Sequence, residues 1–349
     1  MIEHFEIIKI FFLSTITFVA AILLTPLLTN ILDRLNVGKS IRNDGTTPIY
    51  SKLHAKKAGT PAMGGILIWG TVLLVTAIFF LLSVLTDDPF WQRMNFLSRS
   101  QTWLPLGALF AAALVGLLDD IYNVLQRGSK QGGLRVSHRL VIYTLIAIIG
   151  AYWFFFKLDF TAIHVPFIGD FDIGWWYIPV FIFIIVATSF SVNETDGLDG
   201  LAGGVLLTAF AGYGAIAFAQ ERFQLATLCI VIAGALLAFL WFNIQPARFF
   251  MGDTGSMSLG VTLGIVAMLT NTVFLLPIIG IVFVLESFSV IVQVLSKKIR
   301  HKKVFLSAPI HHHFEAKGWP ESRIVMRFWV ISGVFTLIGV VLFLIDQNF

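Results

Sequence analysis

The chain has 349 residues, of which 57% are hydrophobic and only 13% carry a charge. Soluble domains are about half apolar and a quarter charged, so this composition excludes an ordinary soluble protein. The net charge of +4 does not indicate nucleic-acid binding, because the basic residues lie in short segments beside apolar runs, as membrane topology requires. These runs last about 16 to 25 residues, which is typical of transmembrane helices and not of a β-barrel.

We predict an all-α, polytopic integral membrane protein that forms a single domain over residues 1–349. The first apolar run lacks a basic leader and a cleavage site, so it is expected to remain as a span. Cys229 lies inside an apolar run, which indicates packing and not a disulfide. Ten transmembrane helices are expected, at residues 8–32, 63–85, 103–118, 140–156, 174–190, 201–219, 225–242, 256–270, 273–296 and 326–345.

The loops between these helices carry very unequal numbers of basic residues. Of the 24 Lys and Arg residues, 19 fall in the odd-numbered loops or at their edges. The positive-inside rule therefore places these loops in the cytoplasm and both chain termini on the extracytoplasmic side. The same loops are the predicted catalytic loops, near residues 33–62, 119–139, 191–200, 243–256 and 297–325.

The first and third loops are basic and contain glycines, which suits an anionic substrate. Topogenic charge alone would also explain the basic residues of the first loop. The third loop lacks the lysine spacing of a Walker A loop. The basic residues concerned are His54, Lys56, Lys57, Arg127, Lys130, Arg135 and Arg139.

Five aspartates lie on the predicted cytoplasmic side. Asp119 and Asp120 end the third helix and point about 100° apart, where they could simply terminate the span in water. Asp196 and Asp199 in the fifth loop would share one helical face, although Asp196 could instead cap the sixth helix. Asp253 precedes the eighth helix between glycines, where free N–H groups would attract a phosphate.

If the loops converge, these carboxylates repel one another unless a cation neutralises them. Hard oxygen ligands of this kind suit Mg²⁺, which binds one or two carboxylates and otherwise water and phosphate. The sequence therefore predicts a magnesium site at the cytoplasmic end of the helices.

The ninth loop contains three consecutive histidines, His311, His312 and His313. Consecutive imidazoles do not easily converge on one tetrahedral zinc ion, and no loop supplies a cysteine partner. Hydrogen bonding to a diphosphate, or proton transfer, is the predicted role. Glu286 lies near the middle of the ninth predicted helix, where burial of a charge is costly, so it is expected to be paired or functional.

The order of these motifs resembles that of a known family. Asp119-Asp120, Asn193-x-Thr-Asp-Gly-Leu-Asp-Gly and Phe250-Met-Gly-Asp-Thr-Gly-Ser are similar to the polyprenyl-phosphate N-acetylhexosamine-1-phosphate transferase superfamily. The histidine loop, from Pro309 to Arg323, resembles more specifically the phospho-N-acetylmuramoyl-pentapeptide transferase family. The resemblance covers nearly the whole chain.

The resemblance implies transfer of phospho-MurNAc-pentapeptide from its UDP carrier to undecaprenyl phosphate, which gives lipid I and UMP with Mg²⁺. It also implies a ten-span homodimer, surrounded by lipid in the bacterial inner membrane, with its active site facing the cytoplasm. Asp253 would hold the metal beside Asp119 and Asp120, and the phosphates would contact His311 and His312. The implied substrate-binding residues are Lys57, Asn193, Asp196, Asp199, Asn243, Phe250 and His313, with Phe250 stacking on uracil.

Three residues depart from the family pattern. Asn123 stands where a lysine is usual, Phe190 where an asparagine is usual, and Ala62 where a threonine is usual. Loss of the lysine removes a phosphate-binding charge, for which Arg127 is a candidate substitute.

We expect the lipid phosphate to attack directly, with Asp119 as its base or orienting group, and an aspartyl phospho-enzyme is the competing scheme. Within the superfamily, an N-acetylglucosamine-1-phosphate transferase is the alternative, and only Asn123 favours it. A cation-coupled transporter also uses acids inside the membrane, but it places them near the midplane and has internal repeats, which this sequence does not show.

Overall fold

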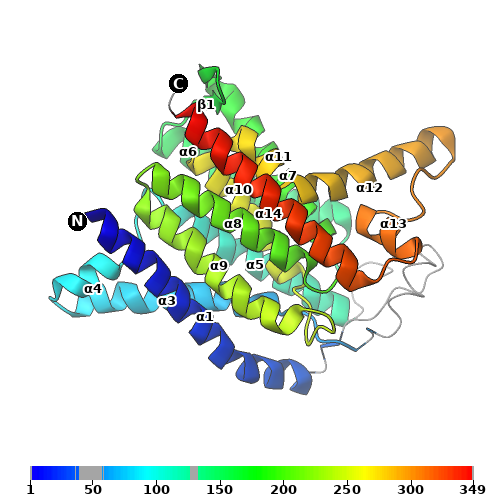
Figure 1. Cartoon of the computed structure of the whole chain (residues 1–349), viewed down its shortest axis with the longest axis horizontal. Coiled ribbons are helices and arrows are strands. Elements are labelled where there is room, and N and C mark those ends of the chain that lie inside the picture. Colours follow the sequence, from blue (N-terminus) through cyan, green and yellow to red (C-terminus); the bar gives the residue numbers. More distant parts are fainter. Residues whose placement is uncertain (1, 36, 39–56, 58, 126–132, 348–349) are drawn as a thin grey trace.

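The structure is a bundle of long helices, and both of its strands lie at one end (Figure 1). It is a computed structural model, which describes residues 2–35, 37–38, 57, 59–125 and 133–347. Several basic residues noted in the sequence lie outside the described residues, including the proposed lysine substitute: His54, Lys56, Arg127 and Lys130.

A helix occupies each of the ten predicted positions, because long apolar runs must satisfy their backbone hydrogen bonds internally. Most of these helices extend a few residues beyond the predicted ends. Their bounds are α1 (Ile2–Arg34), α3 (Gly65–Leu85), α5 (Trp103–Val124), α6 (Val136–Lys157), α7 (Tyr177–Thr195), α8 (Leu201–Ala219), α9 (Phe223–Asn243), α10 (Asp253–Leu269), α12 (Ile281–Arg300) and α14 (Glu321–Asp346).

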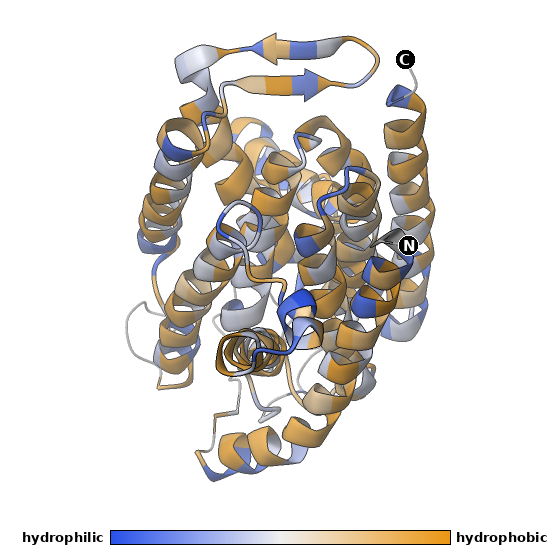
Figure 2. Ribbon diagram, turned by 90° about the vertical axis from the view of Figure 1, so that its left-hand side faces the viewer, coloured by the Kyte–Doolittle hydropathy of each residue, from blue (hydrophilic) through white to orange (hydrophobic). Residues whose placement is uncertain are grey.

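By length and composition, eight helices in the described part of the chain could cross a membrane. The number becomes nine if α12 and the short α11 (Leu276–Ile279), which are bent relative to each other, count as one span. Hydrophobic residues cover most of the helical surface (Figure 2). The prediction of an all-α, multi-span membrane protein is therefore confirmed, whereas α10, with 17 residues, is too short to be counted by this measure.

The prediction of one continuous helix over residues 273–296 is wrong. The chain forms a short 3-10 turn, η3 (Val273–Leu275), then α11, and it bends by 83° before α12. Pro277, in the first turn of α11, has no backbone N–H to donate. Gly280, at the junction with α12, has no side chain that would resist the bend. As a result α12 extends away from the bundle (Figure 1).

The buried helix α10 organises the bundle, because it packs against α5, α7 and α3. Every residue of α10 after Asp253 is buried. Glycines allow the backbones to touch: a Cβ on Gly116 of α5 would lie 2.4 Å from the Asp253 carbonyl oxygen. A Cβ on Gly260 of α10 would lie 2.7 Å from the Cα of Ser189 in α7. The first turn of α10 is therefore closely confined by its neighbours.

The sequence did not predict a β-hairpin, which crosses one end of the bundle (Figure 2). Its strands β1 (Ala162–Val165) and β2 (Gly169–Asp172) pair antiparallel. Asp346, at the end of α14, accepts a hydrogen bond from the Phe167 N–H and lies 2.6 Å from His164 Nε2. These contacts fasten the hairpin to the last helix. The remaining short elements are α4 (Pro89–Met94), η2 (Gly174–Trp176) and α13 (Ile310–Ala316).

We expect the contact between the hairpin and α14 to weaken as the pH rises. Burial opposes a charge on His164, but its hydrogen bonds with Asp346 and Asp170 outweigh this effect and raise its pKa above the ordinary 6.5. The stabilisation is therefore complete below pH 6.5 and is lost as the pH rises through the higher pKa of the folded state.

Hydrogen–deuterium exchange at residues 162–172, corrected for the intrinsic pH dependence of exchange, should therefore increase between about pH 6 and pH 8. His164→Asn is the control, and its corrected exchange should not change with pH. The same pH dependence in both proteins would contradict this assignment.

Candidate functional site

The segment from Asn193 to Gly200 comprises the last residues of α7 and the turn that leads into α8. It contacts three groups of polar side chains. α7 ends at Thr195, and the Asp196 N–H donates to the Asn193 carbonyl at 3.2 Å. Gly200 then adopts a left-handed φ of 82° before α8 begins. This sharp turn lets one short segment reach several neighbouring elements.

The first group, the aspartate cluster, consists of Asp119, Asp120, Arg139, Asn193 and Asp253. The Arg139 guanidinium lies between two carboxylates, with Nη1 2.7 Å from Asp253 Oδ2 and Nε 2.9 Å from Asp119 Oδ2. Asn193 donates from Nδ2 to the other Asp253 oxygen at 2.7 Å. Side chains from α5, α6, α7 and α10 therefore meet at this point, as the convergence of the acidic motifs predicted.

Asp120 binds the backbone at the start of α10. Its carboxylate accepts the N–H groups of Asp253 and Thr254, each at 3.0 Å, at the N-terminus of α10. Gly252 has φ 74°, and a Cβ there would lie 2.5 Å from Asp120 Oδ2, so this approach requires glycine. A carboxylate at this end of a helix is also stabilised by the helix dipole. Asp120 thereby fixes the turn that carries Asp253.

The expectation that these acids lie in loops or at span ends needs correction. Asp119 and Asp120 lie inside α5, which continues to Val124, and both are buried, so they do not end the span in water. Asp253 is the first residue of α10 and not part of the preceding loop. The helices extend past their apolar runs because the acidic side chains find partners on neighbouring helices.

The second group, the lysine cluster, consists of Lys57, Asp199, Gln245, Phe250 and Glu321. Lys57 Nζ lies 2.7 Å from Asp199 Oδ1 and 2.5 Å from Glu321 Oε1. Glu321, the first residue of α14, also accepts the Asp199 backbone N–H at 2.7 Å and the Gln245 amide at 3.0 Å. One lysine therefore bridges two carboxylates, and it lies 6.0 Å from the centre of the half-buried Phe250 ring.

Asn243 connects the lysine cluster to the loop ahead of α10. Its Oδ1 accepts the Gly200 N–H at 2.9 Å, and its Nδ2 donates to the Phe249 carbonyl at 2.8 Å. The Phe250 N–H donates to the Pro61 carbonyl at 2.9 Å. The amide of Asn243 is therefore engaged by the backbone at both ends, and its contact with a nucleoside stays a prediction.

The third group, the histidine cluster, consists of Glu286, His311, His312 and Glu315. His311 Nδ1 lies 2.9 Å from Glu286 Oε2, and His312 Nδ1 lies 2.6 Å from Glu315 Oε2. The two imidazole rings are 4.0 Å apart. The expectation that Glu286 is paired is thus confirmed, and each of these histidines has a carboxylate partner.

His313 is placed differently from its two neighbours. Its Nδ1 accepts the Leu306 backbone N–H at 3.1 Å, so it holds the chain ahead of α13. Burial and the positive charge of Lys317 lower its pKa, which suits an acceptor in the neutral form. Its contact with substrate also stays a prediction.

Three charged residues of these clusters received no site role from the sequence: Arg139, Glu315 and Glu321. Arg139 was only one of several basic residues, and nothing in the spacing distinguished it from them. Glu321 is 264 residues from Lys57 in the chain, so no local pattern signals their contact. The departure at Asn123 removes a lysine, but Arg139 supplies a guanidinium between the aspartates.

Within the described ranges, no three or more His, Cys, Asp or Glu side chains are grouped so as to surround a metal ion. Mg²⁺ does not require such a group, since it binds one or two carboxylates and completes its shell with water and phosphate. The Asp253 side chain is 22% exposed, and Asp119 shares the Arg139 guanidinium with it. These carboxylates are hard oxygen donors of the kind that Mg²⁺ prefers, and in this structure the Arg139 guanidinium lies between them.

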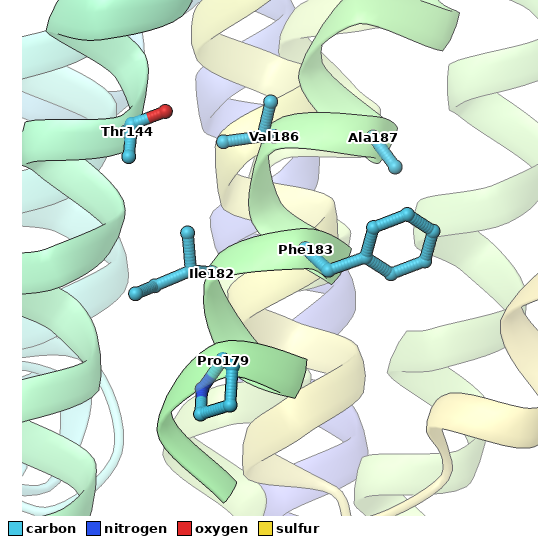
Figure 3. Close-up of a pocket in the computed structure, with 6 residues that line it drawn as sticks. All are labelled: Thr144, Pro179, Ile182, Phe183, Val186 and Ala187. Atoms are coloured by element: carbon cyan, nitrogen blue, oxygen red, sulfur yellow. The ribbon is translucent and has the colours of Figure 1, made fainter. Parts of the chain in front are cut away.

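An apolar groove of about 360 Å³ lies between α6 and α7 (Figure 3). Its lining contains no charged side chain, so it lacks the groups that an ionic reaction requires. The candidate active site is therefore the set of three clusters around Asn193–Gly200. The groove is lined by Thr144, Pro179, Ile182, Phe183, Val186 and Ala187.

Asp120→Ala should destabilise the protein by about 1–2 kcal/mol, because α10 loses the acceptor for two N–H groups at its N-terminus. Any activity that depends on Asp253 should fall as well, since Asp253 lies in that turn. Asp88 caps the six-residue α4 through one N–H, that of Phe90, at 2.8 Å on an exposed surface, so Asp88→Ala is the control, which should cost less stability and leave activity unchanged. Thermal unfolding in detergent measures both, and equal behaviour of the two variants would refute the role of Asp120.

Comparisons with known proteins agree with the order of the motifs. Residues 102–271 match the model of a family described as glycosyl transferase family 4. The chain is 38% identical to the phospho-N-acetylmuramoyl-pentapeptide-transferase of Geobacillus thermodenitrificans, over 93% of this chain and 95% of the relative. It is 39% identical to the protein of that name from Clostridium kluyveri, over 95% and 98% of the two chains. The chain therefore belongs to the phospho-N-acetylmuramoyl-pentapeptide-transferase family.

Proposed function

We propose that this chain transfers phospho-MurNAc-pentapeptide from UDP-MurNAc-pentapeptide to undecaprenyl phosphate, forming lipid I and UMP in peptidoglycan synthesis. Its similarity to transferases of that name, over more than nine-tenths of its length, supports the reaction. One observation carries the proposal: residues 193–200 contact all three charged clusters inside an otherwise apolar bundle. Such a concentration of charge has a high energetic cost in a membrane protein and indicates a functional site.

The position of the clusters suits two substrates that arrive from different phases. Asn193 and Asp253 lie at the ends of α7 and α10, where helices that cross the bilayer meet the polar loops. A soluble nucleotide can reach this level from the water, and a lipid phosphate can reach it from the bilayer. Positive charge is required there because the two anionic substrates repel each other, and carboxylates can hold a metal ion that supplies part of it.

We propose that Asp253 holds Mg²⁺, with Asp119 and Asp120 beside it. When bound, the ion would neutralise the charge that develops on the diphosphate as UMP leaves. Asp120 orients Asp253 through the α10 backbone, and Asn193 orients its carboxylate directly. Arg139 keeps the carboxylates of Asp119 and Asp253 close together.

Direct attack by the lipid phosphate, with Asp119 as its base or orienting group, is the proposed route. Asp119 is fixed by Arg139 and by the Leu134 N–H, and a fixed carboxylate suits an orienting role. Lys57, beside the half-buried Phe250 ring, suits the nucleoside end of the donor. An aspartyl phospho-enzyme remains the competing scheme, and a protein-bound phosphosugar formed without lipid would support it.

We also propose that α10 and the bent pair complete ten spans in the bacterial inner membrane. The 17 residues of α10 rise about 25 Å, close to the thickness of the hydrocarbon layer. The basic residues in the last turn of α12, Lys297, Lys298 and Arg300, support a cytoplasmic position for the neighbouring histidine cluster. Homodimer formation is proposed from the resemblance to the family.

One observation favours a different class of protein. Transporters often have broken helices, and the break at Gly280 is a feature of this kind. The aspartate cluster, however, lies at helix ends and not at the midplane. The transferase therefore accounts for more of the structure than a transporter does.

Asp253→Asn should lower Mg²⁺-dependent UMP release at least about 100-fold, because a neutral amide binds the metal and Arg139 much more weakly. Purified protein is incubated with UDP-MurNAc-pentapeptide, undecaprenyl phosphate and Mg²⁺, and UMP is measured. Asp87→Asn removes an exposed charge far from the clusters and should retain wild-type rates. A wild-type rate for Asp253→Asn would remove Asp253 from the site, and release of UMP only from UDP-GlcNAc would support the alternative transferase.

Cysteine labelling tests the proposed orientation. Lys303→Cys, beyond α12, should react with an impermeant thiol reagent only from the cytoplasm, and Ile168→Cys, in the hairpin turn, only from outside. The natural Cys229 is buried and should not react. Labelling of the two sites from the opposite sides would reverse the topology.

A further inference from the structure

A buried carboxylate of α12 contacts the first histidine of α13. Glu286 Oε2 lies 2.9 Å from His311 Nδ1, and neither side chain has any solvent exposure. Burial of an ionisable pair between two helices, here α12 and α13, has a high energetic cost. Removal of one partner leaves the other buried and unpaired. A pair of this kind is therefore informative about function.

The hydrogen-bond geometry determines which ring nitrogen of His311 carries the proton. Glu286 Oε2 faces both the His311 backbone N–H, at 3.4 Å, and His311 Nδ1. A carboxylate oxygen only accepts, so Nδ1 is the donor, and in the neutral ring Nε2 then carries the lone pair. The carboxylate thus selects one tautomer.

The other ring nitrogen of His311 faces the central segment of the site. Nε2 is buried and has no hydrogen-bond partner among the described residues. A Cβ built on Gly197 would lie 2.2 Å from it, so the absence of a side chain at position 197 makes room for this nitrogen. The ring is therefore held between a carboxylate on one side and the backbone of segment 193–200 on the other.

We propose that Glu286 is a positioning residue of the active site, which fixes the tautomer of His311 and directs Nε2 toward segment 193–200. The inference rests on the proposed function, in which the donor diphosphate binds beside this segment. In that setting Nε2 takes up a proton from solvent water as the donor binds, and as N–H it donates a hydrogen bond to a phosphate oxygen. Glu286 acts only through His311 and does not touch the substrate.

Other titratable groups also surround the pair. His312, on the same helix as His311, has its ring 4.0 Å away and pairs with Glu315. Asp196 precedes Gly197 in the central segment. Glu194, on α7, binds Ser287, the neighbour of Glu286, at 2.8 Å. Glu194 therefore lies near Glu286, inside the central segment. The matched control for removal of a charge is Glu6→Gln in α1, outside the three clusters, where Glu6 pairs with the buried Lys9 at 3.0 Å.

The first test compares two substitutions of Glu286. Glu286→Gln keeps an oxygen that can accept from Nδ1, and it should retain kcat to within about tenfold. Glu286→Leu removes the acceptor, and it should lower kcat by about 10–100-fold with little change in KM, as loss of a group that orients a ligand does. Glu6→Gln should keep the wild-type kcat. An unchanged kcat in Glu286→Leu would overturn the proposal.

The second test is a double-mutant cycle, which separates positioning from general structural support. In a His311→Ala background Glu286 has no histidine to position, so Glu286→Leu should cost no further activity. It should even raise the thermal stability, because it removes a buried, unpaired carboxylate. A further loss of kcat equal to that in the wild-type background would show that Glu286 acts independently of His311.

The third test does not depend on turnover. The ¹⁵N NMR signals of His311, assigned by comparison with His311→Ala, should show a protonated Nδ1 and an unprotonated Nε2 in the wild type. Glu286→Leu should lose this preference. The opposite tautomer in the wild type would overturn the inference, whereas the expected tautomer in a protein that does not release UMP would overturn only the proposed function.

Discussion

The turn between α7 and α8 is the constraint on which the rest of the site depends. Asn193 binds Asp253, Gly197 packs against His311, and Asp199 pairs with Lys57. Eight residues therefore connect side chains from the first loop, from α10 and from α13. Because the turn is short, the three clusters cannot move independently of one another. The position of each cluster follows from the left-handed turn at Gly200 and from the end of α7.

The two halves of the site are supported in different ways. The aspartate cluster is built on the first turn of α10, which is confined by α5 and by the backbone bonds of Asp120. The histidine cluster is carried by α13 and is joined to α12 through Glu286, on a helix that leaves the bundle after the bend at Gly280. Rigid packing therefore positions the Asp253 carboxylate, and one buried ionisable pair positions a histidine.

The sequence predicted all ten helical positions, because a long apolar run in a membrane has few alternatives to a helix. It also predicted that the acidic motifs converge, since the basic residues place their loops on one side. It did not predict the bend at Gly280, because hydropathy reports whether a segment is buried in lipid but not its direction. It missed the partners of Lys57 and Asp119, because Glu321 and Arg139 are distant in sequence and resemble ordinary loop charges.

The close glycine contacts around α10 restrict the amino-acid substitutions that this protein can accept. A methyl group on Gly65 would lie 2.3 Å from the Cα of Gly255, and one on Gly116 would lie 2.4 Å from the Asp253 carbonyl oxygen. Even the smallest enlargement at these positions would displace the turn that carries Asp253. By contrast, the outward side chains of α12 can exchange for others of similar hydrophobicity. Natural variation can therefore remodel the lipid-facing surface while the spacing of the aspartates stays the same.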